Sequence, residues 1–481
     1  MPTPDPTEPT DLARLDATAQ ADLVARGALA PIDLVDAAIA RIERVNPRLN
    51  AVIHPLFEKA RDAARSTALP HGPFRGVPFL VKDAVCTTAG DPYHAGMRFL
   101  KRHAYHAPED SELARRFRAA GFVFVGKTNT PELALSATTE PLAYGPTHNP
   151  WRQGFSPGGS SGGSASAVAA GLAPVAHAND MGGSIRIPAS HCGLVGLKPT
   201  RARSTLAPAF GEYWGPLTHE HVVTRSVRDS AAVLDCIAGP AAGDPYTAPP
   251  FARPLREEVG RAPGQLRVGL ATRAGGSPVH ADCVAAAERT AQLLAELGHA
   301  VEPVVLPELD APQMGPWIAP AVARDLDRLA ERVGHPIGPD DVEPLNWIMA
   351  EQGRAMSAPE YVRQSELAWA WARALCAHWG RAFDVLLTPT AGAPPPPHGV
   401  LGPLAPVEQL FARLGAFTLF TMPFDVTGQP AISLPLFWND GGLPIGSQLV
   451  AGYGREDVLI RLASQLEEAR PWRERRPSVH A

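Results

Sequence analysis

Short apolar runs alternate with helical patterns along this chain, and the alternation limits the folds that it can adopt. Residues 76–85 and 121–130 are predicted to form buried strands, with a helix at about 111–120 between them. The same order of strand, helix and strand returns over residues 266–306. Strands that alternate with helices form parallel or mixed sheets with helices packed outside. We therefore predict the α/β class: one large domain with a mixed β-sheet core covered by α-helices on both sides.

Residues 311–380 show a helical pattern that contains five tryptophans. Packing accounts for tryptophans in such a segment more readily than substrate stacking does, although a lid over a binding site would have the same composition. Strands are predicted at 384–390 and 431–437. The segment 391–398, AGAPPPPH, is predicted as an extended loop, because four successive prolines lack N–H donors and have a fixed φ.

The 481 residues carry a formal net charge of −5. Nucleic acid and anionic membranes require clustered positive charge, so neither is an expected partner. Five cysteines without CxxC spacing predict no disulfide framework and no zinc site. The histidines at 177, 191, 219 and 221 are predicted as ordinary polar residues, because no carboxylate or cysteine set completes a metal site. We expect a cytoplasmic protein without a metal, a cofactor or a signal peptide.

The segment 156–200 carries the residues best suited to catalysis: SPGGSSGGSASAVAAGLAPVAHANDMGGSIRIPASHCGLVGLKPT. Two glycine–serine clusters flank a small-residue helix, and glycine pairs allow positive φ and close backbone approach. Gly182, Gly183 and Ser184 could place a nucleophilic hydroxyl beside N–H donors that hold a developing oxyanion. A lysine could be the base if burial lowers its pKa.

A flexible linker or a phosphate loop is the alternative for an isolated glycine–serine run. A Walker loop requires Gly-Lys-Ser/Thr, which is missing, and a linker would not continue into GGSIRIPASHCGLVGLKPT. The sequence also lacks a GxSxG elbow with an evident histidine partner. This context favours serine chemistry over both alternatives.

The segment strongly resembles the amidase signature, in which GGSSGGS precedes a DxGGSIRxPAxxCGxxGLKPT block and the two catalytic serines are 24 positions apart. Ser160 and Ser184 have this spacing. The resemblance extends upstream to GVPFLVKD, GKTNTPELA and YGPTHNPW, and downstream to GQPAISLP and GLPIGSQLVA. It therefore covers nearly the whole chain, and it implies the amidase signature fold.

The resemblance implies hydrolysis of carbon–nitrogen amide bonds through an acyl-enzyme. Ser184 would be the nucleophile, and Lys82, neutral in the resting enzyme, would take the proton through Ser160. A non-proline cis peptide would precede Ser160. The other implied site residues are the backbone N–H groups of an oxyanion hole (Met181, Gly182, Gly183 and Ser184) and the residues that support its loop (Asp180, Arg186 and Ser161).

Three details are predicted for this sequence in particular. Ser161 and Ser164 are expected to cap the helix that follows them. The positive N-terminus of that helix is expected to help keep Lys82 neutral. Asn179 stands where many family members have threonine or serine, so the loop is expected to differ in detail there while the reaction class stays the same.

Four segments look most similar to the family branch that hydrolyses the cyclic dimer of 6-aminohexanoate: DATAQADLV, VNPRLNAVIHPLFEKAR, VAHANDMGGSIRIPAS and GHPIGPDDVE. The implied partner is a small-molecule amide, linear or cyclic, and a homodimer is left open. Two alternatives remain. One is the glutamine amidotransferase member of the same family, which releases ammonia for tRNA-dependent amidation, and the other is a catalytically inactive binding protein of the same fold.

We expect a disordered N-terminal leader over residues 1–10, followed by the amidase signature domain over residues 11–474. The catalytic core would span about 70–230, and the helical segment at about 311–380 is the candidate lid. Residues 475–481 would form a C-terminal tail.

Overall fold

The computed structural model describes residues 12–274, 276–310, 312 and 314–481. Within these residues one mixed sheet has eleven strands in the order β1-β3-β2-β4-β6-β5-β10-β11-β9-β7-β8. Strands β2, β3 and β4 run parallel, whereas β6 pairs antiparallel with β4. The strands are β1 (Val52–Pro55), β2 (Pro78–Lys82), β3 (Val123–Thr128), β4 (Val175–Asp180), β5 (Val195–Lys198), β6 (His219–Thr224), β7 (Arg267–Leu270), β8 (Ala300–Pro303), β9 (Val385–Pro389), β10 (Ala431–Trp438) and β11 (Pro444–Ala451).

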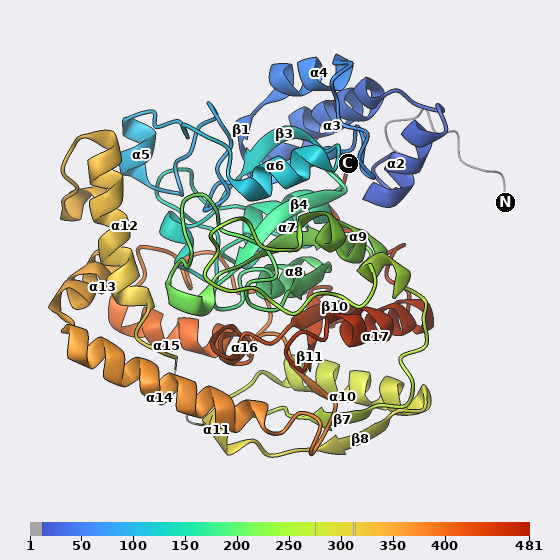
Figure 1. Cartoon of the computed structure of the whole chain (residues 1–481), viewed down its shortest axis with the longest axis vertical. Coiled ribbons are helices and arrows are strands. Elements are labelled where there is room, and N and C mark those ends of the chain that lie inside the picture. The colour runs from blue at the N-terminus through green and yellow to red at the C-terminus, as the bar shows by residue number, and fades with distance from the viewer. Residues whose placement is uncertain (1–11, 275, 311, 313) are drawn as a thin grey trace.

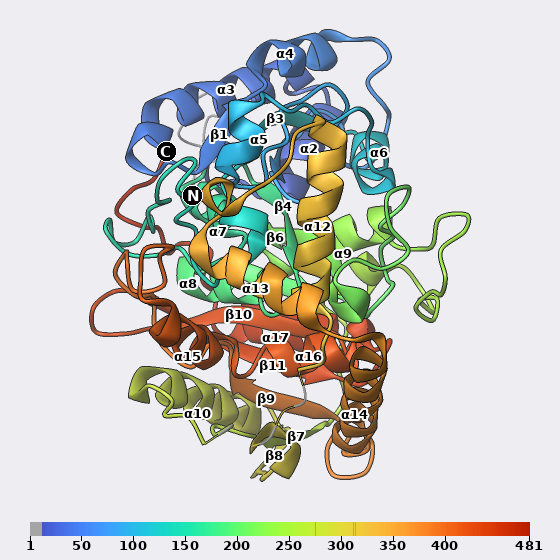
Figure 2. The ribbon, with the colours of Figure 1, turned by 90° about the vertical axis from the view of Figure 1, so that its left-hand side faces the viewer.

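Helices surround this sheet, with α2, α3 and α4 at one end of the molecule and α10 beside β7 and β8 at the other (Figure 1). Figure 2 shows α12 and α13 lying across the side of the molecule that faces the viewer. The helices are α2 (Ala17–Ala25), α3 (Pro31–Val45), α4 (Phe57–Arg65), α5 (Arg98–Arg102), α6 (Glu112–Ala119), α7 (Gly162–Ala169), α8 (Arg186–Cys192), α9 (Val227–Ile237), α10 (Ala281–Glu296), α11 (Pro307–Asp310), α12 (Ile318–Val333), α13 (Pro344–Ala355), α14 (Ala358–Cys376), α15 (Val407–Thr418), α16 (Met422–Thr427) and α17 (Glu456–Ala469).

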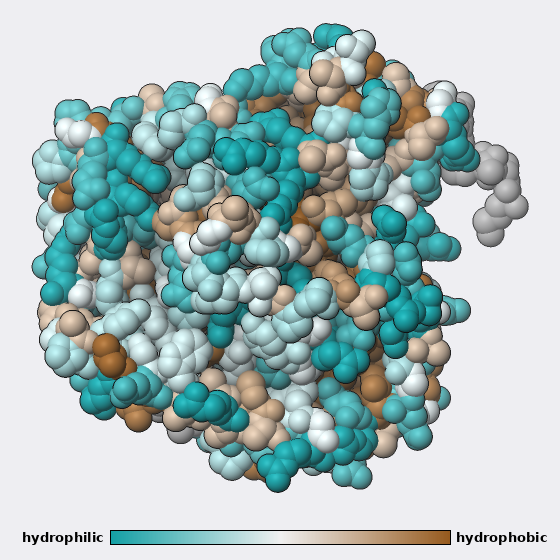
Figure 3. Space-filling view, in the orientation of Figure 1, coloured by the Kyte–Doolittle hydropathy of each residue, from teal (hydrophilic) through white to brown (hydrophobic). Residues whose placement is uncertain are grey.

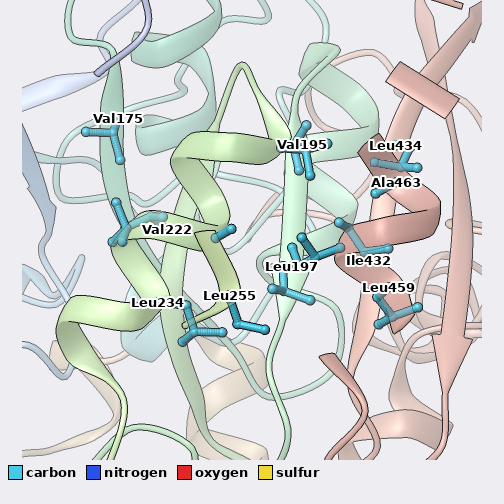
Figure 4. Packing of buried hydrophobic residues seen from close by; sticks show 14 of the residues in the cluster. Val175, Val195, Leu197, Val222, Leu234, Leu255, Ile432, Leu434, Leu459 and Ala463 are labelled. Atoms are coloured by element: carbon cyan, nitrogen blue, oxygen red, sulfur yellow. The ribbon is translucent and has the colours of Figure 1, made fainter. Parts of the chain in front are cut away.

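Apolar cores lie on both faces of the sheet. Successive side chains of a strand point to opposite faces, so Val175 and Ala176 of β4 enter different cores. Val175 belongs to the cluster that includes Leu234 of α9 and Leu459 of α17 (Figure 4), and Ala176 belongs to the cluster that includes Val168 of α7. In the view of Figure 3 the hydrophobic residues of the surface are scattered in small groups among hydrophilic ones. The predicted α/β architecture, with helices on both sides of a mixed sheet, is confirmed.

Each strand predicted from the sequence overlaps an observed strand, but β1, β4, β5, β6 and β11 were not predicted. Strand β4 has the sequence VAHAND and β6 has HEHVVT, and alanine, asparagine, aspartate and glutamate are weak strand formers. These two strands form because they pair with each other along their whole length. Tertiary pairing therefore overrides local propensity in the centre of the sheet.

The predicted helical segment contains helices α12, α13 and α14, and its tryptophans pack as expected. Trp317 and Trp371 are buried. Asp325 of α12 is also buried, and its carboxylate accepts hydrogen bonds from Tyr213 Oη at 2.7 Å and Trp214 Nε1 at 3.0 Å. These contacts fasten α12 to the segment before β6. Movement of these helices as a lid stays a prediction.

The ends of the chain differ in what the structure describes. The predicted leader, residues 1–10, lies outside the described residues. The predicted tail, residues 475–481, lies against the domain: Val479 N donates to Pro150 O at 3.1 Å and Ala481 N donates to Ala170 O at 2.9 Å. Within the described part of the chain, no helix combines the length and the apolar character that a membrane crossing would need.

A pair of buried glutamates joins α13 to the segment that follows β3. Glu132 Oε1 accepts hydrogen bonds from Glu343 N at 2.7 Å and Asn346 Nδ2 at 3.0 Å. Glu343 Oε1 accepts one from Leu142 N at 2.8 Å. Burial raises the pKa of both carboxyls, and the charge of Glu343 raises that of Glu132 further. Above the ordinary glutamate pKa of 4.5, these two carboxyls therefore retain protons in the folded protein that they release in the unfolded chain.

We expect Glu343→Gln to weaken the pH dependence of stability. The folded-state pKa values are raised, so the free energy of unfolding falls as pH rises above the ordinary glutamate pKa of 4.5, by at most about 1.4 kcal/mol per pH unit for each proton. Urea unfolding from pH 5 to 9 should show a shallower fall for Glu343→Gln than for the wild type. Glu351→Gln, an exposed change within α13, should keep the wild-type slope. Equal slopes in all three proteins would contradict the prediction.

Candidate active site

Lys82 ends strand β2, and its side chain is completely buried. Its Nζ donates hydrogen bonds to Ser160 Oγ at 2.7 Å and to Asn179 Oδ1 at 2.5 Å. Burial lowers the pKa of Lys82 from 10.5 to about 7, against the opposing effect of the Glu220 and Asp180 carboxylates. Because a buried amine is costly to charge, a large share of Lys82 is neutral near pH 7 and able to accept a proton.

Ser160 lies in the loop before α7, and the peptide bond between Gly159 and Ser160 is cis, as the family resemblance implied. The loop is tightly packed, because a Cβ on Gly159 would lie only 2.4 Å from Thr138 O. Ser160 itself is fully buried against Lys82. The predicted pairing of Lys82 with Ser160 is therefore present in the structure.

The prediction that Ser161 and Ser164 cap α7 is wrong. Ser161 lies at the start of the helix without a side-chain cap bond, and its Oγ donates to Asn179 O at 3.3 Å. Ser164 Oγ donates to His177 O at 2.7 Å. Strand β2 pairs with β4 only as far as Ala176, so the later β4 carbonyls that do not face β6 need other donors. The two hydroxyls supply them and tie α7 to the sheet.

A single carboxylate organises the loop that carries Ser184. Asp180 Oδ1 accepts from Gly183 N at 2.6 Å, and Asp180 Oδ2 accepts from Ile185 N at 3.0 Å and Arg186 Nε at 2.9 Å. Burial favours the neutral acid, but the charge and hydrogen bonds of Arg186 outweigh it and hold the pKa of Asp180 well below its ordinary value. The ionised Asp180 therefore fixes the turn from β4 into α8.

Ser184 differs from the other two predicted triad residues in its exposure. Lys82 and Ser160 are completely buried, whereas Ser184 and its neighbour Gly182 are partly exposed. A substrate arriving from solvent can thus reach Ser184 but not the other two side chains. This arrangement suits a nucleophile that is served by a buried proton acceptor.

The predicted oxyanion hole requires one correction. The N–H of Gly183 is bonded to Asp180, so it is not a free donor. The N–H groups of Met181, Gly182 and Ser184 make no hydrogen bond to another of the described residues. Three of the four predicted donors are thus available to an incoming oxyanion.

Three further residues hold this loop and were not identified from the sequence. Arg186 Nη1 donates to Thr421 O and to Gln448 Oε1, both at 2.9 Å, and Arg186 Nη2 donates to Asp425 Oδ2 at 2.6 Å. Thr421 Oγ1 also donates to Gly182 O at 2.6 Å. Gln448 lies in the GLPIGSQLVA block. The resemblance of this block to the amidase family is the sequence feature that could have indicated a role for Gln448.

A sequence model of the amidase family matches residues 33–460. The chain belongs to the amidase family. A 6-aminohexanoate-cyclic-dimer hydrolase of Paenarthrobacter ureafaciens is 44% identical over 479 residues, which cover 96% of each chain. A protein of the same name from Pseudomonas sp. (strain NK87) is 43% identical over 479 residues, again covering 96% of each. A solved structure of 6-aminohexanoate cyclic dimer hydrolase has a TM-score of 0.92 and 42% identity, and covers 97% of this chain and 99% of that chain.

These likenesses confirm the predicted class of enzyme, since the family and the two curated relatives are hydrolases of amide bonds. This amidase thus acts on carbon–nitrogen bonds. The roles of its individual residues remain proposals, which the geometry above supports.

We expect Gly183→Ala to reduce amidase activity severely. Gly183 has φ +133°, and an added Cβ would lie 2.4 Å from Thr421 Oγ1 and 2.6 Å from Ile187 Cδ1. The loop would have to move, and misplacement of a nucleophile by about 1 Å can cost about 100-fold in rate. Steady-state kinetics should show this loss mainly in kcat. Gly415→Ala, on α15 with open space around the new methyl, should retain activity, and a fully active Gly183→Ala would contradict the expectation.

Proposed function

We propose that this amidase hydrolyses small cyclic amides, the cyclic dimer of 6-aminohexanoate first among them, through an acyl-enzyme on Ser184. The observation that carries the proposal is the contact between the buried, readily deprotonated Lys82 and Ser160. The loop that follows β4 adds a partly exposed serine, Ser184, and free N–H donors. The substrate is inferred from the two curated relatives, both hydrolases of that cyclic dimer by name.

In the proposed reaction Ser184 Oγ attacks the amide carbonyl and gives its proton to Ser160, whose own proton passes to Lys82 Nζ. The carbonyl oxygen becomes an oxyanion that the N–H groups of Met181, Gly182 and Ser184 stabilise. Collapse of this intermediate breaks the carbon–nitrogen bond, and Lys82 returns the proton to the leaving amine through Ser160. Water then attacks the ester by the same proton path and frees Ser184.

A cyclic amide makes a particular demand on the pocket. When one amide of a cyclic dimer is cleaved, the leaving amine stays covalently attached to the acyl group on the enzyme. The site must therefore accommodate the whole opened chain until water releases it. A linear amide instead loses its amine before the second step, so the two substrate types place different demands on one site.

We expect wild-type enzyme to open the cyclic dimer and Ser184→Ala to lose about 10⁴-fold or more in kcat. Liquid chromatography of the linear product measures the rate, and a fluorophosphonate should label wild-type Ser184 stoichiometrically. Ser66→Ala, an exposed serine between α4 and β2, is the matched control and should keep full activity. Activity that survives in Ser184→Ala would refute the nucleophile, and hydrolysis of glutamine alone, dependent on a partner, would refute the substrate.

We also expect kcat/KM to rise with pH through about 7. Only neutral Lys82 can accept a proton, and the fraction of neutral amine increases as pH passes its lowered pKa of about 7. A profile from pH 5 to 9 should show this rise in wild-type enzyme, and Lys82→Met should lose activity at every pH. A flat profile across this range would be inconsistent with Lys82 as the base.

A further inference from the structure

Lys82 has a second hydrogen-bond partner, Asn179, whose amide orientation is determined by its surroundings. Asn179 Nδ2 donates to Ala84 O at 3.2 Å and to Glu220 Oε1 at 3.3 Å. A backbone carbonyl can only accept a hydrogen bond, so the amide nitrogen must face Ala84. The amide oxygen then faces Lys82 Nζ and accepts from it. The atom that Asn179 presents to the catalytic amine is thus its amide oxygen, which can only accept a hydrogen bond.

Glu220 continues this chain of contacts away from Lys82. Asn179 and Glu220 are directly opposite in the antiparallel pairing of β4 with β6, which places their side chains on the same face. His177 lies two residues before Asn179 on that face, and its Nε2 is 2.5 Å from Glu220 Oε2. His177 and Glu220 are both buried. The order of contacts is therefore Lys82, Asn179, Glu220 and His177.

The hydrogen-bond acceptor at Asn179 determines how the N–H groups and the lone pair of neutral Lys82 can be oriented. A neutral amine has two N–H groups and one lone pair. When one N–H is bound to Asn179 Oδ1, the lone pair can face Ser160 and accept its hydroxyl proton. After proton uptake the ammonium donates to both Asn179 and Ser160, with the contacts that the structure contains. Asn179 therefore suits both states of the base without rearrangement.

Glu220 is one of few charges close to this amine. The charged groups that act on Lys82 are Glu220 from β6 and Asp180 from β4. His177 is bonded to Glu220, and the charge of Glu220 also acts on Cys86. Asp83, the residue after Lys82, forms an ion pair with Lys127 at 2.7 Å. Asp180 is already bound to Arg186, and Asp83 to Lys127. Glu220 is the carboxylate with the larger effect on Lys82 and favours its protonated form. It opposes the burial that favours the neutral form.

We propose that Asn179 and Glu220 are positioning residues for the base: Asn179 directs the lone pair of Lys82 to Ser160, and Glu220, held by His177, sets the pH above which Lys82 is active. This inference rests on the proposed triad but not on the identity of the substrate. It also gives a role to Asn179, the residue that departs from the threonine or serine of many family members.

The test is the rate of fluorophosphonate labelling of Ser184 as a function of pH, which needs no substrate. Glu220→Gln removes a negative charge, so the midpoint of the pH dependence should move to lower pH by about one unit. Asn179→Asp adds a carboxylate against Lys82 in nearly the same volume, so the midpoint should move to higher pH by about one unit. A general loosening of the site would not produce shifts of opposite sign.

Asp229→Asn is the matched control. Asp229 is a buried carboxyl on α9 that accepts hydrogen bonds from Ala17 N at 2.7 Å and Thr18 N at 2.9 Å, and it is not among the groups around Lys82. The pH midpoint of Ser184 labelling in this variant should equal that of the wild type. Thermal unfolding of each variant establishes that it is folded. If Glu220→Gln fails to fold, the direction in which Asn179→Asp shifts the pH midpoint of labelling tests the positioning role.

Each failure has a distinct signature. Wild-type protein that is not labelled at Ser184 would refute the triad and the positioning role together. Labelling of the wild type without hydrolysis of the cyclic dimer would refute only the proposed substrate. The third outcome is that Asn179→Asp and a folded Glu220→Gln are both labelled at Ser184 with the pH midpoint of the wild type. That result would overturn the positioning role and leave the triad intact.

Discussion

The burial of one amine at the end of β2 is the constraint on which the rest of the site depends. An ammonium group inside a protein loses its hydration, and the protein must either deprotonate it or surround it with acceptors. Lys82 meets both conditions, since its pKa is lowered to about 7 and its Nζ contacts Ser160 and Asn179. The same burial that would be a cost elsewhere makes this lysine a base near neutral pH.

Burial of the base requires that a more accessible group face the substrate, and the loop after β4 provides it. Asp180 and Arg186 hold this loop from within, while Thr421 and Gln448 hold it from a part of the chain more than two hundred residues away. Ionic groups buried this deeply stabilise a structure only when each has good partners. Here the hydrogen bonds and ion pairs around Asp180 and Arg186 all hold the turn that carries Ser184. The network therefore fixes the position of the nucleophilic oxygen.

Much of this was predictable from local pattern. The glycine–serine pattern around Gly182, Gly183 and Ser184 indicated serine chemistry, because close backbone packing and free N–H groups leave a recognisable composition. The pairing of Ser160 with Lys82 came only from the resemblance to the amidase family. Apolar runs such as 76–85 and 121–130 indicated the strands around the lysine. The pattern failed for β4 and β6, whose alanine and charged residues gave no strand signal, and it assigned Ser161 and Ser164 to helix capping when they bond to β4 instead.

The sequence by itself determined the α/β class, the chemical type of the site and the family, because these depend on residue types in a fixed order. Only the tertiary structure decided which polar groups meet. It removed the Gly183 N–H from the oxyanion hole by bonding it to Asp180, and it placed Glu220 opposite Asn179 through strand register. The Asn179–Glu220 contact joins residues 41 positions apart, and the Gly183–Asp180 bond depends on how one loop folds back on itself. Both depend on strand pairing, burial and loop conformation, which no local pattern of residue types records.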